Sequence, residues 1–314
     1  MKKIITRLGI FLIVLFGCDR VIVYFFAKYI FPKTLSGESG GTVNYLLNRK
    51  KNVDFVVMGS SRAKHHINPA LLSNLYNGNG YNIGINGTGG VIYNNLLLNL
   101  MLEKGVKPKM LLLQTDPYPY FTVDNVNNVA EISPLYPFMD EGKKFKELIM
   151  QNSGYAEKVK LMFHSYRYNG KMVNLFFNFL KTNSIKENNG FEGTPGRIDT
   201  AAFSISADPE EKLNFSEAKT NALTGIIQNC KANNIRLAIV FPPSYRNSIY
   251  SKAGNKKMIE LLHRNGVSEI YDFSNVEELP SLQSGELWKN ATHLNNQGAA
   301  RFSLLLNEAL KQFK

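Results

Sequence analysis

The chain has 314 residues, of which 44% are hydrophobic and 20% are charged, a composition typical of a folded globular protein. This length suits one large or two small domains, and the composition excludes collagens, coiled coils, repeat arrays and polytopic membrane proteins. The formal net charge of +12 favours anionic partners such as nucleic acids, lipid head groups or acidic glycans. With only Cys18 and Cys230, the sequence predicts neither a disulfide framework nor a cysteine-based metal site.

The amino terminus predicts a membrane anchor. An unbroken run of apolar or small residues, 8–18, follows three basic residues, and the apolar character resumes after Asp19 and Arg20. One helix over residues 8–31 would measure roughly 36 Å, enough to cross a bilayer. Asp19 and Arg20 would each cost about 2.5–3.5 kcal/mol inside a membrane unless they are paired. We favour an uncleaved transmembrane anchor over residues 1–31.

A second interpretation of the same segment is a lipoprotein signal peptide that is cleaved before Cys18. Phe16 is bulky for such a cleavage site, and the apolar stretch after Cys18 differs from the polar tether of a mature lipoprotein. Basic residues lie on both sides of the apolar run, so charge alone does not orient the chain. Under either interpretation, we expect the chain to be attached to a membrane.

Strands and helices alternate after a linker over residues 32–52. Each expected strand is short, apolar and rich in β-branched residues, and the longer helices show a 3.6-residue apolar period. The expected strands are 53–58, 80–85, 109–115, 236–241 and 269–273, and the expected helices open at Pro69 and cover 91–104, 216–233, 255–265 and 296–313. This alternation predicts an α/β fold with a doubly wound parallel sheet of about five strands, which binds ligands at the carboxyl ends of its strands.

Residues 116–214 interrupt the alternation with proline, tyrosine, asparagine and several short helical patterns. We predict a helical insertion there, inside an α/β domain that spans residues 53–314. Its aromatic residues either stack on sugars or form a core for the insertion, and we favour the core; they are Tyr118, Tyr120, Tyr136, Phe138, Phe163, Tyr166 and Tyr168. Phe176, Phe177 and Phe179 are expected to be packing residues.

Several patterns indicate no function. Residues 37–41 match the string G-x-S-x-G, but no strand precedes them, so we assign them to the linker. His65 and His66 are adjacent and would point about 100° apart on a helix, an arrangement that does not suit a shared metal. The sequence has no phosphate-binding loop, dinucleotide fingerprint or nucleic-acid module. We therefore expect no metal, no organic cofactor and no nucleic-acid partner.

Three segments near the expected carboxyl ends of the strands carry candidate chemistry. Ser61 follows the first strand, where a turn into a helix offers backbone N–H groups that can stabilise an oxyanion. A pair of helix-capping serines is the alternative for Ser60 and Ser61. Residues 82–87 follow the second strand, and glycine there allows close approach of a ligand. His293 precedes the last helix, where it could act as a general base for Ser61; taken alone, it would be assigned to the surface.

In this order, the three segments resemble the SGNH/GDSL hydrolase superfamily. Residues 59–62 (Gly-Ser-Ser-Arg) are similar to its first block, 82–87 to its second, and 290–295 to its D-x-x-H block. The resemblance covers residues 53–310 without the insertion and implies a flavodoxin-like sheet. It also implies that Ser61 is the nucleophile, that His293 is the base, and that the N–H groups of Ser61 and Gly87 form the oxyanion hole. The anchored layout is most similar to membrane-tethered bacterial proteins of alginate O-acetylation and of D-alanyl transfer to teichoic acids.

Two positions depart from the family pattern. Asn290 replaces the acid of D-x-x-H, and the third block, normally G-x-N-D, reads Gln-Thr-Asp-Pro over residues 114–117. We hypothesise that Asp116 takes over as the partner of His293, with Asp272 as a second candidate acid. The alternative is a weakened or inactive triad. Arg62 either holds an anionic acceptor or forms a structural ion pair.

The resemblance implies an acyl esterase or O-acyltransferase that acts on a cell-envelope polysaccharide, anchored by one helix and facing the periplasm or exterior. The competing interpretation is a non-catalytic accessory protein that binds glycan or a partner membrane acyltransferase. An active Ser61 would discriminate between the two, because a capping serine does not react with electrophilic probes.

Overall fold

The chain folds into two compact units. Residues 1–50 and 128–186 form a helical unit, and residues 51–127 and 187–314 form an α/β unit. The computed structural model describes residues 2–35, 40–87, 90–117, 129–168, 170–180, 188–200 and 214–311. The predicted insertion is thus divided, because only its middle part belongs with the anchor. Its end returns to the sheet, where Asn82 donates its backbone N–H to the carbonyl of Asn189 at 2.8 Å.

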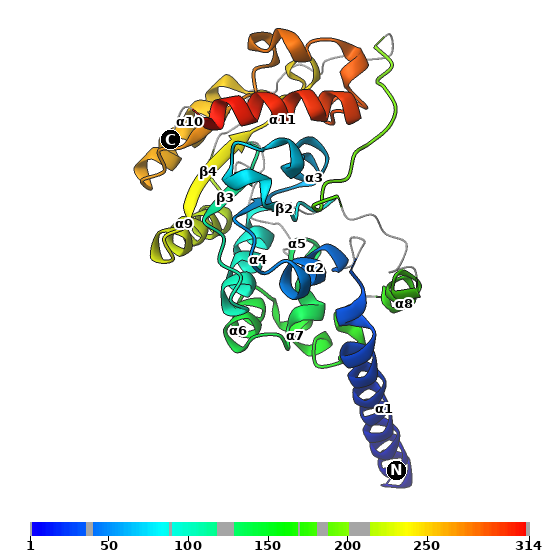
Figure 1. Cartoon of the computed structure of the whole chain (residues 1–314). Helices are drawn as coiled ribbons and strands as arrows, with labels where there is room; N and C mark the ends of the chain where they lie inside the picture. The colour runs from blue at the N-terminus through cyan, green and yellow to red at the C-terminus, as the bar shows by residue number, and fades with distance from the viewer. Residues whose placement is uncertain are drawn as a thin grey trace. The chain divides into compact units, whose positions relative to one another are not determined.

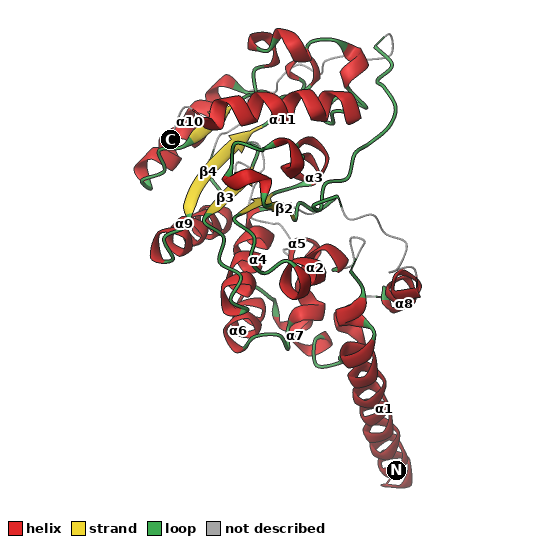
Figure 2. Ribbon diagram, in the orientation of Figure 1, coloured by secondary structure: helices red, strands yellow, loops and turns green. Residues whose placement is uncertain are grey.

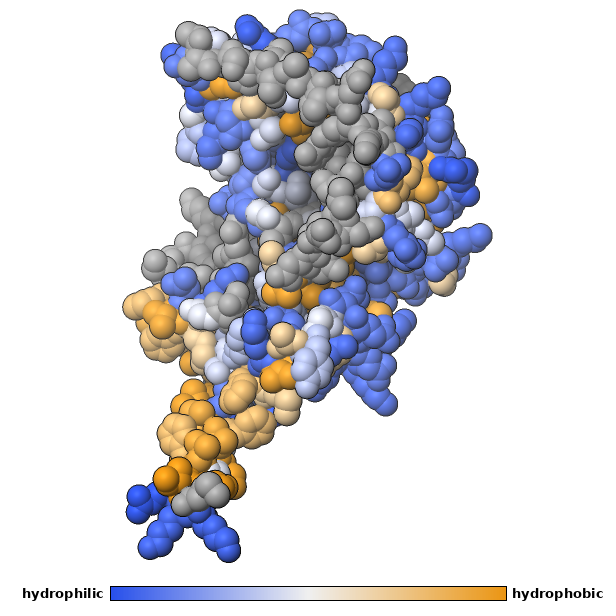
Figure 3. All heavy atoms as spheres, turned by 180° about the vertical axis from the view of Figure 1, so that it is seen from behind, coloured by the Kyte–Doolittle hydropathy of each residue, from blue (hydrophilic) through white to orange (hydrophobic). Residues whose placement is uncertain are grey.

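The amino-terminal helix α1 (Lys2–Tyr29) is continuous through Asp19 and Arg20. With the 3₁₀ helix η1 (Phe31–Lys33), it is long and apolar enough to cross a membrane. Figure 3 shows apolar side chains gathered along this helix, with hydrophilic residues at its free end. Val23 and Phe26 of its second half are buried. The predicted anchor is therefore one helix, and part of it belongs to a folded unit.

The predicted linker contains a helix. Helix α2 (Gly41–Arg49) buries Val43, Leu46 and Leu47, which recur at the three- and four-residue spacing of an apolar helix face. Residues 37–39 of the G-x-S-x-G string lie outside the described residues. The other elements of the helical unit are α5 (Val129–Ile132), η5 (Ser133–Phe138), α6 (Lys143–Gln151), α7 (Tyr155–Lys160), η6 (Ser165–Tyr168) and α8 (Met172–Leu180).

Aromatic residues form much of the core of the helical unit. Tyr136, Phe138 and Tyr168 are buried, as expected for a core of the insertion. Phe31 makes edge contacts with Phe138 and Tyr168 at ring-centroid distances of 5.1 and 5.4 Å. Tyr118 and Tyr120 lie outside the described residues.

Other aromatic side chains of the helical unit face outward. Phe163 is 38% exposed, whereas Tyr166 is half-buried and donates its hydroxyl to Glu157 at 2.9 Å. The prediction that Phe176 and Phe177 pack in a core is wrong, because they are 42% and 53% exposed. Hydrophobicity along a helix does not reveal which of its faces a neighbour covers.

The α/β unit contains a five-stranded sheet in the order β2-β1-β3-β4-β5. Every pairing is parallel; Val57, for example, lies between Asn82 and Leu112. The strands are β1 (Phe55–Met58), β2 (Gly80–Asn82), β3 (Met110–Gln114), β4 (Arg236–Phe241) and β5 (Ile270–Asp272). The predicted α/β class and five-stranded parallel sheet are confirmed, with strands one to three residues shorter at some ends.

Helices cover both faces of the sheet (Figures 1 and 2). Helix α4 packs against α9 on one face, and α3 packs against α11 on the other. The helices are α3 (Ser61–His66), α4 (Val91–Glu103), α9 (Glu217–Ala232), α10 (Lys252–Arg264) and α11 (Asn296–Lys311). Short 3₁₀ turns are η2 (Pro69–Leu71), η3 (Tyr76–Gly78), η8 (Tyr245–Asn247), η9 (Val276–Glu278), η10 (Pro280–Leu282) and η11 (Gly285–Leu287).

The helix after the first strand begins earlier than predicted. We expected it to open at Pro69, but α3 begins at Ser61 and ends before that proline, which opens only the short turn η2. Ser60 caps α3 by accepting the backbone N–H of Arg62 at 3.2 Å. Ser61 is therefore the first residue of the helix that follows β1, next to the central strand β3.

Candidate functional site

The turn between β1 and α3 places Ser61 at the carboxyl edge of the sheet. The first backbone N–H groups of a helix have no partner within it, so the N–H of Ser61 lies where an anion can be bound. Gly59 enables this turn with a φ of +148°, and a Cβ atom on it would lie 2.6 Å from Gln114 Oε1. Gly84 is constrained in the same way, since its Cβ would lie 2.6 Å from the backbone nitrogen of Lys64.

Ser61 and His293 meet across the sheet edge although 232 positions separate them. Ser61 Oγ lies 2.8 Å from His293 Nε2, a hydrogen-bond distance. The segment that carries His293 is held by the buried His66, whose Nε2 accepts the backbone N–H of Leu294 at 3.0 Å. An antiparallel bridge between Trp288 and Leu294 closes the base of the same loop.

The second ring nitrogen of His293 faces Asn290. Its Nδ1 lies 3.1 Å from Asn290 Oδ1 and 3.0 Å from Thr292 Oγ1. Asn290 Oδ1 also accepts the backbone N–H groups of Thr292 and His293 at 3.0 and 2.9 Å. These two donors identify the oxygen of the amide, so Nδ1 carries the proton that it donates to Asn290. Nε2 is then free to accept the hydroxyl proton of Ser61.

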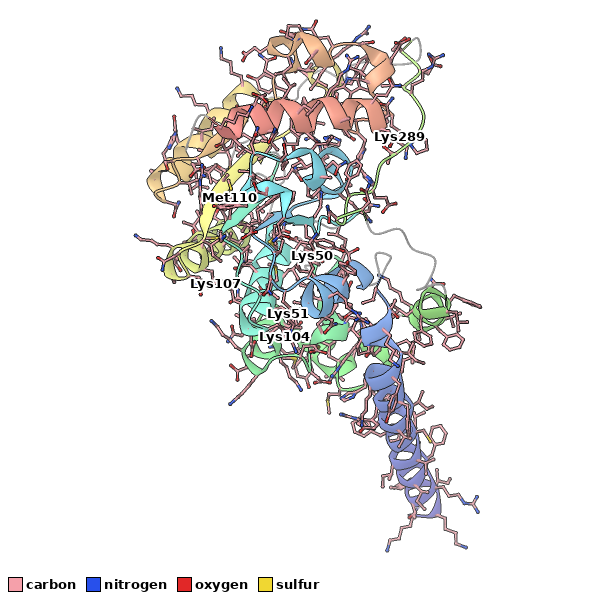
Figure 4. All side chains as sticks on the ribbon, viewed as in Figure 1. Lys50, Lys51, Lys104, Lys107, Met110 and Lys289 are labelled. Carbon is pink, nitrogen blue, oxygen red and sulfur yellow. The ribbon has the colours of Figure 1, made fainter. Side chains whose placement is uncertain are left out.

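The surroundings of His293 keep its imidazole neutral. Burial, followed by the positive charges of His65, Arg62 and Lys289, lowers the pKa of His293 to about 4. Figure 4 labels Lys289 in the segment before α11. Met110, labelled in the same figure, is the first residue of β3 and lies at the amino-terminal edge of the sheet, opposite the carboxyl edge that carries the site. At neutral pH the ring can therefore accept a proton, although the charges that act on it from the described residues are positive and disfavour the imidazolium that would result.

Gln114 connects the nucleophile turn to the third strand. Its Oε1 accepts the backbone N–H of Ser60 at 3.0 Å and the hydroxyl of Ser60 at 2.9 Å. Its Nε2 donates to Asp116 Oδ2 at 3.0 Å. Sequence reasoning noted Gln114 only as a departure from a family block. Its position at the end of a buried strand was the available signal for a structural role.

Asp116 does not pair with His293, which corrects our hypothesis. It forms an ion pair with Arg62, and the pair is closely surrounded by protein. Burial raises the pKa of Asp116, and the Arg62 guanidinium opposes that rise. The sequence predicted that Arg62 and Asp116 each lie near the carboxyl end of a strand. Their pairing depends on the side-by-side placement of β1 and β3, which the sequence pattern does not specify.

Arg62 is unavailable for the anionic acceptor that was one interpretation of it. Its side chain is only 5% exposed. Besides Asp116, it donates to the backbone carbonyls of Pro242 and Pro243 at 2.8 and 2.5 Å. Consecutive helical residues point about 100° apart, so Arg62 turns inward from the position of Ser61. The alternative interpretation, a structural ion pair, describes its observed contacts.

Asp272 is also occupied elsewhere. Its carboxylate accepts the side-chain amide of Asn255 at 3.1 Å and the backbone N–H of Ser274 at 3.0 Å. It anchors the loop after β5 to helix α10. Its role as a second candidate acid for His293 is therefore not supported by its contacts.

Gly87 ends the described part of the loop after β2, with a φ of +76°. This loop runs beside the nucleophile turn, because Ile85 donates its backbone N–H to the carbonyl of Gly59 at 3.2 Å. The side chain of Asn82 fixes the loop against α3 by donating to the carbonyls of Ala63 and Ile67, both at 2.7 Å. The oxyanion-hole role of Gly87 stays a prediction.

A polar cavity of about 540 Å³ opens next to the loop that carries His293. Its walls include Thr194, Arg197 and Asn296, and Asn295 lies two residues from His293. Among the described residues, no group of three histidine, cysteine or carboxylate side chains is placed to hold a metal ion. No protein-family model matches the chain, and no curated protein matches it.

Proposed function

We propose that the protein is a membrane-anchored acyl esterase or O-acyltransferase of the SGNH/GDSL type, acting on a cell-envelope polysaccharide. The observation that carries the proposal is the 2.8 Å contact between Ser61 Oγ and His293 Nε2. The strand order β2-β1-β3-β4-β5 supports it, since this is the order of flavodoxin-like sheets.

In the proposed reaction, His293 removes the hydroxyl proton as Ser61 Oγ attacks the carbonyl carbon of an ester. The N–H groups of Ser61 and Gly87 hold the negatively charged oxygen of the tetrahedral intermediate. The intermediate collapses, His293 returns the proton to the departing alcohol, and an acyl group stays on Ser61. A water molecule or an acceptor hydroxyl then gives its proton to His293 and attacks the acyl group. The bond between the acyl carbon and Ser61 Oγ breaks, and His293 returns the proton to Ser61 Oγ.

Because Asn290 stands in the place of the triad acid, we expect this chemistry to be slow. Its Oδ1 orients the His293 ring, but an amide cannot neutralise an imidazolium. In serine proteases, replacing the triad acid by its amide lowers turnover roughly 10⁴-fold. The charges that act on His293 come from His65, Arg62 and Lys289, all cationic when protonated. This feature favours a second candidate function, a non-catalytic accessory protein whose cleft binds glycan or a membrane acyltransferase.

The proposed location is the outer face of a bacterial cytoplasmic membrane, with the α/β unit in the periplasm or exterior. Helix α1 supports membrane attachment by its length and its exposed apolar side chains. The orientation comes from the family resemblance alone.

The decisive experiment is labelling of the detergent-solubilised full-length protein with a fluorophosphonate serine probe. The whole chain is required, because Val23 and Phe26 of α1 belong to the buried part of the helical unit. Ser61→Ala and His293→Ala are compared with Ser73→Ala and His263→Ala, which replace the same residue types away from the site. Loss of labelling in the first pair alone supports the enzyme. A folded wild-type protein that takes no label supports the accessory function.

A further inference from the structure

Asp19 and Arg20, two charged residues in the middle of α1, bind the turn that follows α7. Asp19 accepts the backbone N–H groups of His164 and Ser165 at 2.7 and 2.9 Å. Arg20 contacts the ring of His164 and donates to the carbonyl of Met162 at 3.0 Å. Residues 162–165 thus replace most of the water that these charges would otherwise require, while Nε of Arg20 is buried without a hydrogen-bond partner among the described residues.

The length of α1 places this turn at the depth of the bilayer. The uncharged run over residues 8–18 measures only roughly 16 Å, whereas a hydrocarbon core is about 30 Å thick. About 20 residues are needed, and a span that starts after Arg7 reaches that length at Ala27. If α1 crosses a membrane, Asp19 and Arg20 therefore lie inside it, and residues 162–165 lie at the same level.

Three exposed apolar side chains around the turn suit that environment, next to the exposed Lys160, which pairs with Glu157. Val159, Met162 and Phe163 are 43%, 55% and 38% exposed, and the ring of Phe163 contacts Phe16 with centroids 5.7 Å apart. Such a cluster is unfavourable in water but is matched to lipid chains. The turn thus presents polar backbone to α1 and apolar side chains outward.

A cavity of about 880 Å³ opens beside this pairing, between α1 and residues 137–168. Its lining combines apolar and aromatic side chains with cations; among them are Arg20, Tyr24, Phe25, Lys28, Arg167 and Tyr168. The part of α1 that lines the cavity runs from Arg20, inside the expected span, to Lys28 at the end of that span. Its volume is that of a site for a small amphiphile or for the head group and upper chains of a lipid.

The charges in the cavity wall leave Lys28 available for a phosphate. Asp140 pairs with Arg167 at 2.5 Å, and Glu141 is the other carboxylate in the wall. Among the described residues Lys28 forms no ion pair. Its ammonium group donates to the hydroxyl of Tyr24 at 3.0 Å and lies 5.2 and 5.3 Å from the ring centres of Tyr24 and Tyr29, which leaves two further N–H donors for a phosphate. Lys28 also lies eight residues beyond Arg20 along α1, roughly 12 Å nearer the membrane surface.

We infer that this cavity binds one membrane phospholipid, with its phosphate at Lys28 and its acyl chains along α1 toward the membrane centre. The inference rests on the membrane attachment in the proposed function, but not on the chemistry of Ser61. It gives the helical unit a task of its own, which is to hold a lipid of the membrane.

The test is native mass spectrometry of the full-length protein in detergent, titrated with phosphatidylglycerol and, separately, with phosphatidylcholine. We expect the wild type to retain one molecule of either lipid. Ala27→Trp fills the cavity and should lose it, whereas Ala156→Trp, on the exposed face of α7, should keep it. Lys28→Glu should weaken retention at least about tenfold, and Lys158→Glu should not.

Equal lipid retention by Ala27→Trp and Ala156→Trp would overturn the inference, as would a wild-type protein that retains no phospholipid. Recovery of the wild type in the soluble fraction of the cell, without detergent, would instead show that the membrane attachment is wrong. Failure of the Ser61 chemistry is separable, because it appears as absent probe labelling in a protein that still holds its lipid.

Discussion

The two units of this chain differ in where they put their large apolar side chains. Within the described residues of the α/β unit, only Ile249 and Leu304 are both large and well exposed, and the remaining core is closed. The helical unit exposes such side chains along α1, α7 and α8. The same kind of residue is thus a core residue in one unit and a surface residue in the other. This difference is the one expected if the α/β unit faces water and α1 crosses a membrane, as we propose.

Charged residues differ between the units as well. In the α/β unit, Arg62 and Asp116 are enclosed by backbone carbonyls and the amide of Gln114. In the helical unit, Asp19 and Arg20 are satisfied mainly by the backbone of a single turn. In the sequence, Arg62 and Asp116 were candidate site residues, and Asp19 and Arg20 were unfavourable charges inside an expected membrane span. In the structure, both pairs make structural contacts. Ser61 and His293, for which we propose acyl-transfer chemistry, are uncharged at neutral pH.

The difference in burial predicts unequal costs for the same substitution. Phe302 is fully buried beside α3, so Phe302→Ala should lower the free energy of unfolding by about 3–5 kcal/mol. Phe177→Ala removes a half-exposed ring and should cost less than about 0.5 kcal/mol. Urea unfolding of the full-length protein in detergent, followed by circular dichroism, measures both. Similar losses in the free energy of unfolding for the two variants would contradict the difference in burial between the two units.

Breaking the enclosed ion pair should cost nearly as much. Arg62→Ala leaves the buried carboxylate of Asp116 without its cation, and we expect a loss of about 3–5 kcal/mol. Lys311→Ala breaks an exposed pair with Glu308 and should cost at most about 1 kcal/mol. The fluorescence of Trp288, the single tryptophan and fully buried in the α/β unit, reports this unfolding. A small effect of Arg62→Ala would show that the pair contributes little to the fold.

Restoring an acid beside His293 should strengthen the site. Asn290→Asp places a carboxylate about 3 Å from Nδ1, where it favours the imidazolium and raises the pKa of His293. If the protein is an esterase, the labelling rate and kcat/KM for a small ester should rise at least about tenfold. Asn265→Asp, at the end of α10, serves as the control. An unchanged rate would mean that Asn290 already performs the orienting role in full.

The pH dependence should show the smallest but most specific effect. Because the pKa of His293 is lowered to about 4, the acidic limb of the labelling rate is expected near pH 4 instead of near 6.5. Unfolded histidine binds a proton near 6.5, so the free energy of unfolding should fall as the pH decreases from about 6.5 to 4. In the Asn290→Asp variant, the acidic limb of the labelling rate should move to a higher pH. A wild-type limb near 6.5 would contradict the geometry described for this loop.

Much of the α/β unit could be predicted because its information is local. Runs such as residues 55–58 and 110–114 are short, apolar and flanked by polar turns, and each becomes a strand. Ser61 and His293 could be predicted together because parallel strands and their following helices bring such positions to one edge. The predicted start of this helix, at Pro69, was wrong. Proline is a strong signal for a first helical turn, and the prediction followed it instead of the capping by Ser60 that starts α3.

The helical unit could not be predicted to the same extent. Its segments, residues 1–50 and 128–186, are far apart in the sequence and lack a repeated pattern that would join them. The exposure of Phe176 and the pairing of Asp19 depend on which surface a neighbour covers. A hydrophobic pattern shows how apolar a face is, but not whether protein or lipid lies against it.

The sequence by itself determined the apolar amino-terminal helix, the alternating elements of a parallel sheet, and the order in which Ser61, Asn290 and His293 occur. These features follow from side-chain period and local backbone preference, which act over a few residues. Only the tertiary structure decided that Asp116 pairs with Arg62 and not with His293. Such contacts are set by the lateral order of strands and the direction of each side chain, and neither is encoded within one short segment.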